Sequence, residues 1–135
     1  MNIGRHLIIE CRGRHAHLSE QELETLLMAG AEAGGASVLQ AHFHPFGAGK
    51  GITGVVLLAE SHITVHTWPE HDYAAFDVFM CGGCRPMQAA EVITSACPGA
   101  VTSVQSIERG LPISAENISA NLSSSHLQSS SFRIG

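Results

Sequence analysis

Apolar residues recur along the chain with two different periods, one typical of strands and one typical of helices. The changes between them indicate where each element begins and ends. Residues 5–11 (RHLIIEC) form a short apolar run between polar residues, which is typical of a strand. Ser19 followed three residues later by Glu22 is a capping box, and it begins a helix whose apolar stripe ends at the glycine pair 34–35. Pro86 indicates the first turn of a second helix, which we expect to run to Cys97 and to end before Pro98. The pattern predicts further strands at residues 37–44, 52–59, 62–68, 73–81 and 101–108, and a flexible loop at 45–51.

These elements come in the order β-α-β-β-β-β-α-β. Clustered strands with only two helices are typical of an α+β fold. We therefore expect a two-layer sandwich in which a mostly antiparallel sheet carries both helices on one face. Strands as apolar as these predict that the second face is also covered, and a second copy of the chain is the simplest cover.

The chain is long enough for one domain. It has 135 residues, and its hydrophobic content of 44% is sufficient for a core. From residue 113 onward the sequence is Ser/Asn-rich and lacks periodicity. We therefore divide the chain into a folded domain, residues 1–112, and a mobile tail, residues 113–135.

Charge and hydropathy exclude several classes of partner. The formal net charge is −5 and basic residues number seven, which argues against nucleic-acid binding. No apolar run approaches the ~20 residues of a membrane span. The N-terminus is too short and too charged for a signal peptide, so we expect a cytoplasmic protein whose four cysteines are thiols.

Histidines and cysteines are the first candidates for chemistry. His42 and His44 share one face of a strand, as do His62 and His66, but no metal-binding spacing accompanies them, and we predict no metal site. Cys81 and Cys84 form a CxxC motif ahead of a helix start, where a dithiol can be redox-active. Since no thioredoxin-like βαβ unit precedes the motif, a single functional thiol is the better interpretation.

A second candidate is the corner that the pattern places at Glu60–Ser61. Corners usually take Gly, Asn or Pro. Ser61 is either a nucleophile or a serine that hydrogen-bonds its own backbone. The absence of a G-x-S-x-G elbow argues against a hydrolase nucleophile, and the residues by themselves favour neither interpretation. His66 is five residues away, so in a straight strand it faces the opposite side unless Ser61 lies in the corner or a bulge intervenes. The single lysine, Lys50, lies in a Gly-rich loop, which leaves no buried lysine for pyridoxal phosphate chemistry.

Residues 54–83, GVVLLAESHITVHTWPEHDYAAFDVFMCGG, closely resemble the small bacterial and archaeal S-adenosylmethionine decarboxylases. The likeness extends to GRHL at 4–7, AHFH at 41–44 and ITG at 52–54, and covers about residues 4–110. The motifs ESH, HTWPE, YAA and CG, taken together as one series, are highly specific to that family.

The resemblance implies a proenzyme that cleaves itself between Glu60 and Ser61. Ser61 would become a pyruvoyl group, the cofactor that forms a Schiff base with the amine of the substrate. His66 matches the proton acceptor for processing, and Cys81 matches the proton donor for catalysis. Cys84 is additional to the family pattern and receives no role.

The resemblance also implies the substrate site and the assembly. Phe46 matches an aromatic residue that stacks on adenine, and Thr53, Trp68 and Glu70 are further substrate-binding candidates; Thr53 stands where a serine is common. The expected partners are the substrate and a second subunit, in a homodimer of cleaved two-chain units whose active sites lie where the subunits meet.

The function implied is decarboxylation of S-adenosylmethionine to the aminopropyl donor for spermidine synthesis. One alternative is the same pyruvoyl chemistry acting on arginine or ornithine. Another is a non-enzymatic dimer or metal-binding module, against which the joint presence of Ser61, His66 and Cys81 argues.

Overall fold

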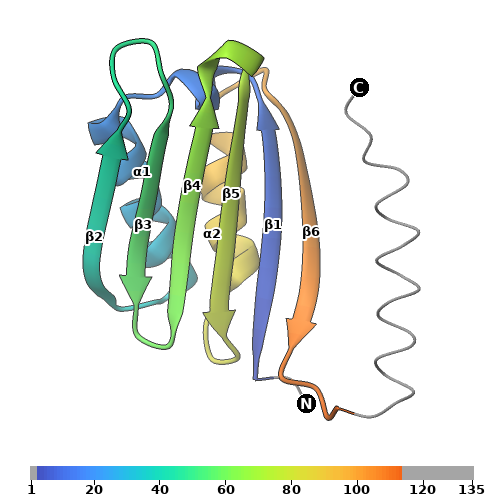
Figure 1. Cartoon of the computed structure of the whole chain (residues 1–135). Helices are drawn as coiled ribbons and strands as arrows, with labels where there is room; N and C mark the ends of the chain where they lie inside the picture. The colour runs from blue at the N-terminus through green and yellow to red at the C-terminus, as the bar shows by residue number, and fades with distance from the viewer. Residues whose placement is uncertain (1–2, 114–135) are drawn as a thin grey trace.

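Six antiparallel strands form one sheet, in the order β2-β3-β4-β5-β1-β6, with two helices on one of its faces (Figure 1). The computed structural model describes residues 3–113, so the predicted mobile tail lies, apart from Ile113, outside the described residues. The strands are β1 (Gly4–Arg12), β2 (Val38–Pro45), β3 (Ile52–Leu58), β4 (Ser61–Trp68), β5 (Tyr73–Cys81) and β6 (Val101–Arg109). The helices are α1 (Glu20–Gly34) and α2 (Pro86–Ser95), with short 3-10 helices η1 (Arg14–His17) and η2 (Pro69–His71). The predicted α+β sandwich and its element order are confirmed.

Local sequence accounts for the ends of both helices. The Ser19 hydroxyl accepts a hydrogen bond from the Glu22 amide at 3.1 Å, and the Glu22 carboxylate accepts one from the Ser19 amide at 3.0 Å, which is the predicted capping box. Gly35 ends α1 with a left-handed φ of 75°. α2 starts at Pro86 as predicted but ends at Ser95, so the expectation that it runs to Cys97 is wrong. The reason is that a residue before proline disfavours helical geometry, and Cys97 precedes Pro98.

The hydrophobic core lies between the helices and the sheet. Strand alternation sends every second side chain of the central strands into it. On the edge pair β2–β3, the Phe43 ring lies over Gly54, and a Cβ at Gly54 would come within 2.2 Å of that ring. The fully buried large side chains include Leu7, Ile9, Leu23, Leu27, Val56, Ile63, Val65, Phe76, Val78, Met80 and Ile93.

Within residues 3–113, no helix covers the second face of the sheet (Figure 1). Its central positions mix polar and apolar side chains, most of them half-buried: His6, Ile8, Glu10, Thr53, Val55, His62, Thr64, His66, Ala75, Asp77 and Phe79. We expected a more apolar surface here. The difference arises because apolar core positions alternate with Thr, His and Asp on β4 and β5. Neither helix within residues 3–113 is long and apolar enough to cross a membrane.

Candidate active site

The β3–β4 hairpin turns at Ala59–Glu60, one residue earlier than the predicted corner. Leu58 pairs directly with Ser61, so the loop has only two residues. The commonest two-residue hairpin loops contain residues with positive φ. Glu60 has a φ of 61°, and among residues 3–113 only Asp72 is a second non-glycine residue with positive φ. Such a conformation costs about 1–3 kcal/mol in a residue with a Cβ, so the peptide ahead of Ser61 is strained.

Ser61 is the first residue of β4, and its side chain is buried against the neighbouring strand. Its exposed fraction is 8%, and its Oγ accepts a hydrogen bond from the Cys81 amide at 3.2 Å. The interpretation that Ser61 bonds its own backbone is therefore wrong, because the partner lies on β5. The hydrogen bond joins two of the three predicted catalytic residues.

Cys81 ends β5, and its thiol contacts a second thiol. The two Sγ atoms of Cys81 and Cys84 are 3.4 Å apart. The hydrogen bond from Cys84, followed by one from the Gly83 amide, lowers the pKa of Cys81, while burial and the Glu60 carboxylate oppose this shift. Burial, together with the hydrogen bond that it donates, raises the pKa of Cys84. The CxxC spacing was the available signal for this contact, although we had assigned Cys84 no role.

His66 lies at the other end of the hairpin, where it contacts Thr53. The His66 Nδ1 and Thr53 Oγ1 atoms are 3.0 Å apart, and the two residues are direct cross-strand partners. The β4 register runs without a bulge from Ser61 to Trp68, so Ser61 and His66 point to opposite faces. Five residues at about 3.4 Å each separate them by roughly 17 Å along the strand. One chain therefore does not bring His66 to Ser61.

A hollow of ≈ 340 Å³ surrounds His66. It lies between the β2–β3 loop and η2, and is lined by Phe46, Lys50, Gly51, Thr53, His66, Thr67, Trp68 and Glu70. All four predicted substrate-binding residues are in this set. Sequence analysis missed Lys50, the one cation of the hollow, and Thr67, whose hydroxyl accepts a hydrogen bond from the Ile52 amide at 2.9 Å.

Trp68 is held in this hollow by stacking. Its ring centroid is 5.4 Å from that of Tyr73, with an interplanar angle of 22°. The Tyr73 hydroxyl donates to the Glu10 carboxylate at 2.7 Å. The indole therefore has a fixed support, while Phe46, in the preceding loop, is 56% exposed.

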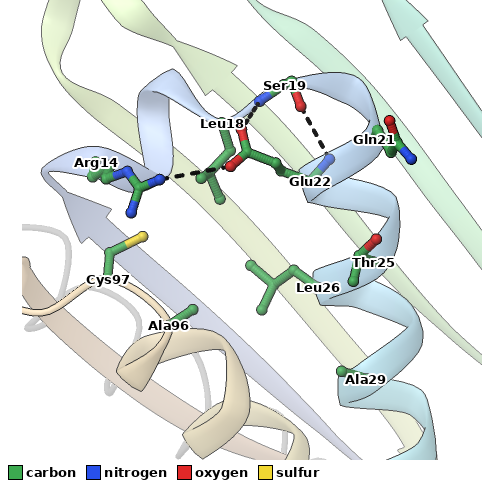
Figure 2. Close-up of a pocket in the computed structure, with 10 residues that line it drawn as sticks. All are labelled: Arg14, Leu18, Ser19, Gln21, Glu22, Thr25, Leu26, Ala29, Ala96 and Cys97. Atoms are coloured by element: carbon green, nitrogen blue, oxygen red, sulfur yellow. Dashed lines mark hydrogen bonds and ion pairs between the residues drawn. The ribbon is translucent and has the colours of Figure 1, made fainter.

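A larger hollow, of ≈ 510 Å³, lies on the helical layer between the first half of α1 and Ala96–Cys97 (Figure 2). It contains none of the predicted site residues. Its charged groups bind each other: Glu22 accepts the capping hydrogen bond from Ser19 and lies 3.6 Å from the Arg14 guanidinium. Burial raises the pKa of its one thiol, Cys97. This hollow offers no activated group, and the candidate site is the hairpin.

The candidate site is thus divided between the two ends of one hairpin. One half consists of the strained corner with Ser61 and Cys81; the other consists of His66 and the hollow around it. In the middle of the uncovered face, His6 Nε2 lies 3.0 Å from the Asp77 carboxylate. No group of three or more His, Cys, Asp or Glu side chains within residues 3–113 is placed to hold a metal ion.

Comparison with known proteins places the chain beside one family. The family model described as S-adenosylmethionine decarboxylase matches residues 5–110. The S-adenosylmethionine decarboxylase proenzyme of Thermodesulfovibrio yellowstonii is 38% identical over 112 residues, covering 81% of this chain and 82% of the relative. That of Caldicellulosiruptor saccharolyticus is 39% identical over 122 residues, covering 86% of this chain and 98% of the relative. The crystal structure of the adenosylmethionine decarboxylase from Aquifex aeolicus superposes with a TM-score of 0.72 at 31% identity, covering 83% of this chain and 94% of that one.

Proposed function

Because the chain belongs to the S-adenosylmethionine decarboxylase family, we propose that it decarboxylates S-adenosylmethionine with a pyruvoyl group made from its own Ser61. The family membership expected from the ESH and HTWPE motifs is confirmed. The product is the aminopropyl donor for spermidine synthesis. The observation that carries the proposal is the strained Glu60 corner, with the Ser61 hydroxyl hydrogen-bonded to the backbone of Cys81.

The residues at the corner fit a pyruvoyl group. The Ser61 Oγ attacks the Glu60 carbonyl carbon, the C–N bond breaks, and the released amine takes the hydroxyl proton, which leaves an ester. A base then removes the α-proton of Ser61, and the Glu60 carboxylate leaves. Hydrolysis of the resulting dehydroalanine releases ammonia and leaves the ketone at the head of residues 61–135. Strain at Glu60 favours the first step because the attack relieves it.

The chain offers no lysine in place of this ketone. Its single lysine, Lys50, is exposed in the β2–β3 loop and is not a buried amine. The pyruvoyl group supplies an electron sink for the electrons left when carbon dioxide departs.

We assign the proton that replaces the carboxylate to the thiol of Cys81. Cys81 lies on the uncovered face of the sheet, and its amide already contacts Ser61. The lowered pKa of Cys81 makes its thiol a stronger acid than an ordinary cysteine. Its position and its acidity together support this role.

We further propose that the active enzyme is a homodimer of cleaved two-chain units. The base assigned to processing, His66, lies about 17 Å along the strand from Ser61 in the same chain. In a two-fold dimer with the uncovered faces in contact and the strands running oppositely, the corner of one protomer lies beside the His66 of the partner subunit. The half-buried Ile8, Val55 and Phe79 give that contact an apolar component.

The same dimer arrangement also determines which residues form the substrate pocket. Phe46 and Glu70 line the hollow at the His66 end, so they would complete the pocket of the partner subunit. Phe46 meets the His44 ring edge to face and is 56% exposed, which leaves ring surface for stacking on the adenine. Glu70 is suited to the ribose hydroxyls or to the sulfonium charge. Cytoplasmic location stays a prediction from the sequence.

Intact-mass measurement of the purified protein tests the proposal. We expect two chains under denaturing conditions, with the larger one lacking an N-terminal amine. Ser61→Ala should remain a single chain and release no carbon dioxide from S-adenosylmethionine, whereas the control Ser95→Ala, at the end of α2, should behave as wild type. An uncut chain that decarboxylates would refute the mechanism. Product from arginine or ornithine alone, assayed side by side, would overturn the substrate and leave the mechanism intact.

A further inference from the structure

Cys81 and Cys84 face each other across the tight turn that joins β5 to α2. The Cys84 amide donates to the Cys81 carbonyl at 3.0 Å, which closes a four-residue turn. The end Cα atoms of such a turn are less than about 7 Å apart. A disulfide joins Cα atoms about 4.4–6.8 Å apart, so the turn holds the two residues near bonding geometry.

The two sulfur atoms need to move only a short distance to form a bond, and the surrounding residues leave space for that movement. The Sγ atoms are 3.4 Å apart, and a disulfide bond would bring them roughly 1.4 Å closer. The spacer residues Gly82 and Gly83 are exposed, and nothing lies within 4 Å of a Cβ placed at Gly83. The one other hydrogen bond of the Cys84 thiol, to the Gly35 carbonyl, is long at 3.9 Å. Neither the spacer nor the surroundings prevent closure.

We propose that Cys81 and Cys84 form a reversible disulfide when the enzyme meets a peroxide, and that this bond switches off decarboxylation. The second half of this inference rests on the proposed role of Cys81 as proton donor. A sulfur held in a disulfide has no proton to give, so the oxidised enzyme cannot complete turnover. Oxidation leaves the cut between Glu60 and Ser61 unchanged, because formation of the S–S bond breaks no backbone bond.

The oxidation proceeds in two balanced steps. The Cys81 thiolate attacks one peroxide oxygen, the O–O bond breaks, and the other oxygen leaves with a proton as water or an alcohol, which gives a sulfenic acid. The Cys84 sulfur then attacks the Cys81 sulfur, the S–O bond breaks, and hydroxide leaves with the Cys84 proton as water. Two thiols lose two hydrogens in total, and the peroxide is the oxidant. A reducing dithiol returns the disulfide to two thiols by exchange and is itself oxidised to a disulfide.

The other two cysteines do not compete for the peroxide. Burial raises the pKa of Cys11 to about 12, and burial also raises the pKa of Cys97. Both side chains are buried, with exposed fractions of 0% and 3%. Because the thiolate is the reactive species, the half-exposed Cys81 with its lowered pKa is the first to react. Cys84 then captures the sulfenic acid before it oxidises irreversibly.

Mass spectrometry of oxidised wild-type enzyme tests the bond itself. The purified protein is treated with hydrogen peroxide, its remaining thiols are alkylated under denaturing conditions, and the peptides are mapped. We expect a link between residues 81 and 84, with a loss of about 2 Da, while Cys11 and Cys97 stay alkylated. The map reads the link whether or not the chain is cut, so a failure of the pyruvoyl proposal would not hide it. Absence of the link, at peroxide levels that oxidise Cys81 in a Cys84→Ser variant, would overturn the proposal.

Activity measurements test the consequence, with each variant compared with its own untreated sample. Oxidised wild type should lose roughly 10²-fold or more of its decarboxylation rate and regain it with dithiothreitol. Cys84→Ser should lose activity without regaining it, since its Cys81 goes on to the sulfinic acid. Cys97→Ala is the matched control and should keep the full cycle. Full recovery in Cys84→Ser, or a linked enzyme that retains its activity, would refute the switch.

Discussion

A His66→Ala chain should be cut when it is paired with a Ser61→Ala chain, although neither variant should cut itself. The expectation follows from the divided site. In a symmetric dimer, each site takes Ser61 from one protomer and His66 from the other. A mixed dimer then has one site in which both residues are changed and one in which both are intact. The intact site belongs to the Ser61 of the His66→Ala chain.

The distances in the structure make this a strict test. A general base lies about 2.6–3.2 Å, between heavy atoms, from the group whose proton it removes, or it acts through one water. His66 and Ser61 of one chain are separated by roughly 17 Å along a strand without a bulge and point to opposite faces. No side-chain rotation closes such a gap. Cutting within one chain by the His66 of that chain would require β4 to be rebuilt.

The assay uses two purification tags. The two variants are co-expressed, mixed dimers are isolated through both tags in turn, and the chains are weighed by denaturing mass spectrometry. Before isolation, random pairing puts about half of the His66→Ala chains into mixed dimers, so about half should be cut. After isolation nearly all of them should be cut, and the Ser61→Ala chains should stay whole.

A matched control removes the supplied base. The His66→Ala chain paired with a chain that carries both Ser61→Ala and His66→Ala should stay uncut. Isolated mixed dimers that contain only whole chains would refute the shared site. Full cutting of the His66→Ala variant by itself would show that His66 is not the base at all.

Three further variants test catalysis, substrate binding and fold stability separately. Cys81→Ala should still be cut into two chains but should decarboxylate roughly 10²–10⁴-fold more slowly, as labelled carbon dioxide release measures; a normal rate would remove Cys81 from the role of donor. Phe46→Ala should weaken transition-state binding of S-adenosylmethionine by about 0.5–1.5 kcal/mol, read from kcat/KM, with cutting unchanged; equal kinetics would exclude stacking on the adenine. Gly54→Ala should lower the free energy of unfolding by about 1–3 kcal/mol in urea, because its Cβ would overlap the Phe43 ring. An unchanged midpoint would show that the β2–β3 edge adjusts freely.

Sequence reasoning succeeded where the determinant is local. The ends of α1 follow from the Ser19–Glu22 capping box and Gly35, which the structure shows as hydrogen bonds within one turn. The start of α2 follows from Pro86 in the same way. The predicted position of the β3–β4 corner was one residue too late. The apolar pattern continues through Leu58, and neither Ala59 nor Glu60 is a residue type typical of turns.

The layout of the site could be predicted only in part. The sequence motifs identified the residues of the site. The period-two alternation of a strand predicted that Ser61 and His66 lie on opposite faces unless the strand has a bulge. Whether a bulge exists depends on the register with β3 and β5, which the sequence does not state. The contact between Cys81 and Cys84 depends likewise on the geometry of the turn before α2, and the spacing alone does not distinguish a thiol pair in contact from two separate thiols.

The division of the site has a consequence for the order of events in maturation. Cutting between Glu60 and Ser61 removes the covalent connection of β3 to β4, two neighbours in the middle of one sheet. After the cut, β4 stays covalently joined to β5 through η2, but it is held to β3 only by their hydrogen-bonded ladder and by the core beneath. A chain that carried base and hydroxyl together could cut itself as soon as the hairpin formed, before these ladders were complete. In the proposed dimer the base comes from a second subunit, so cutting follows dimerisation, and dimerisation requires a complete sheet. The strained peptide bond after Glu60 therefore persists until the fold no longer depends on it.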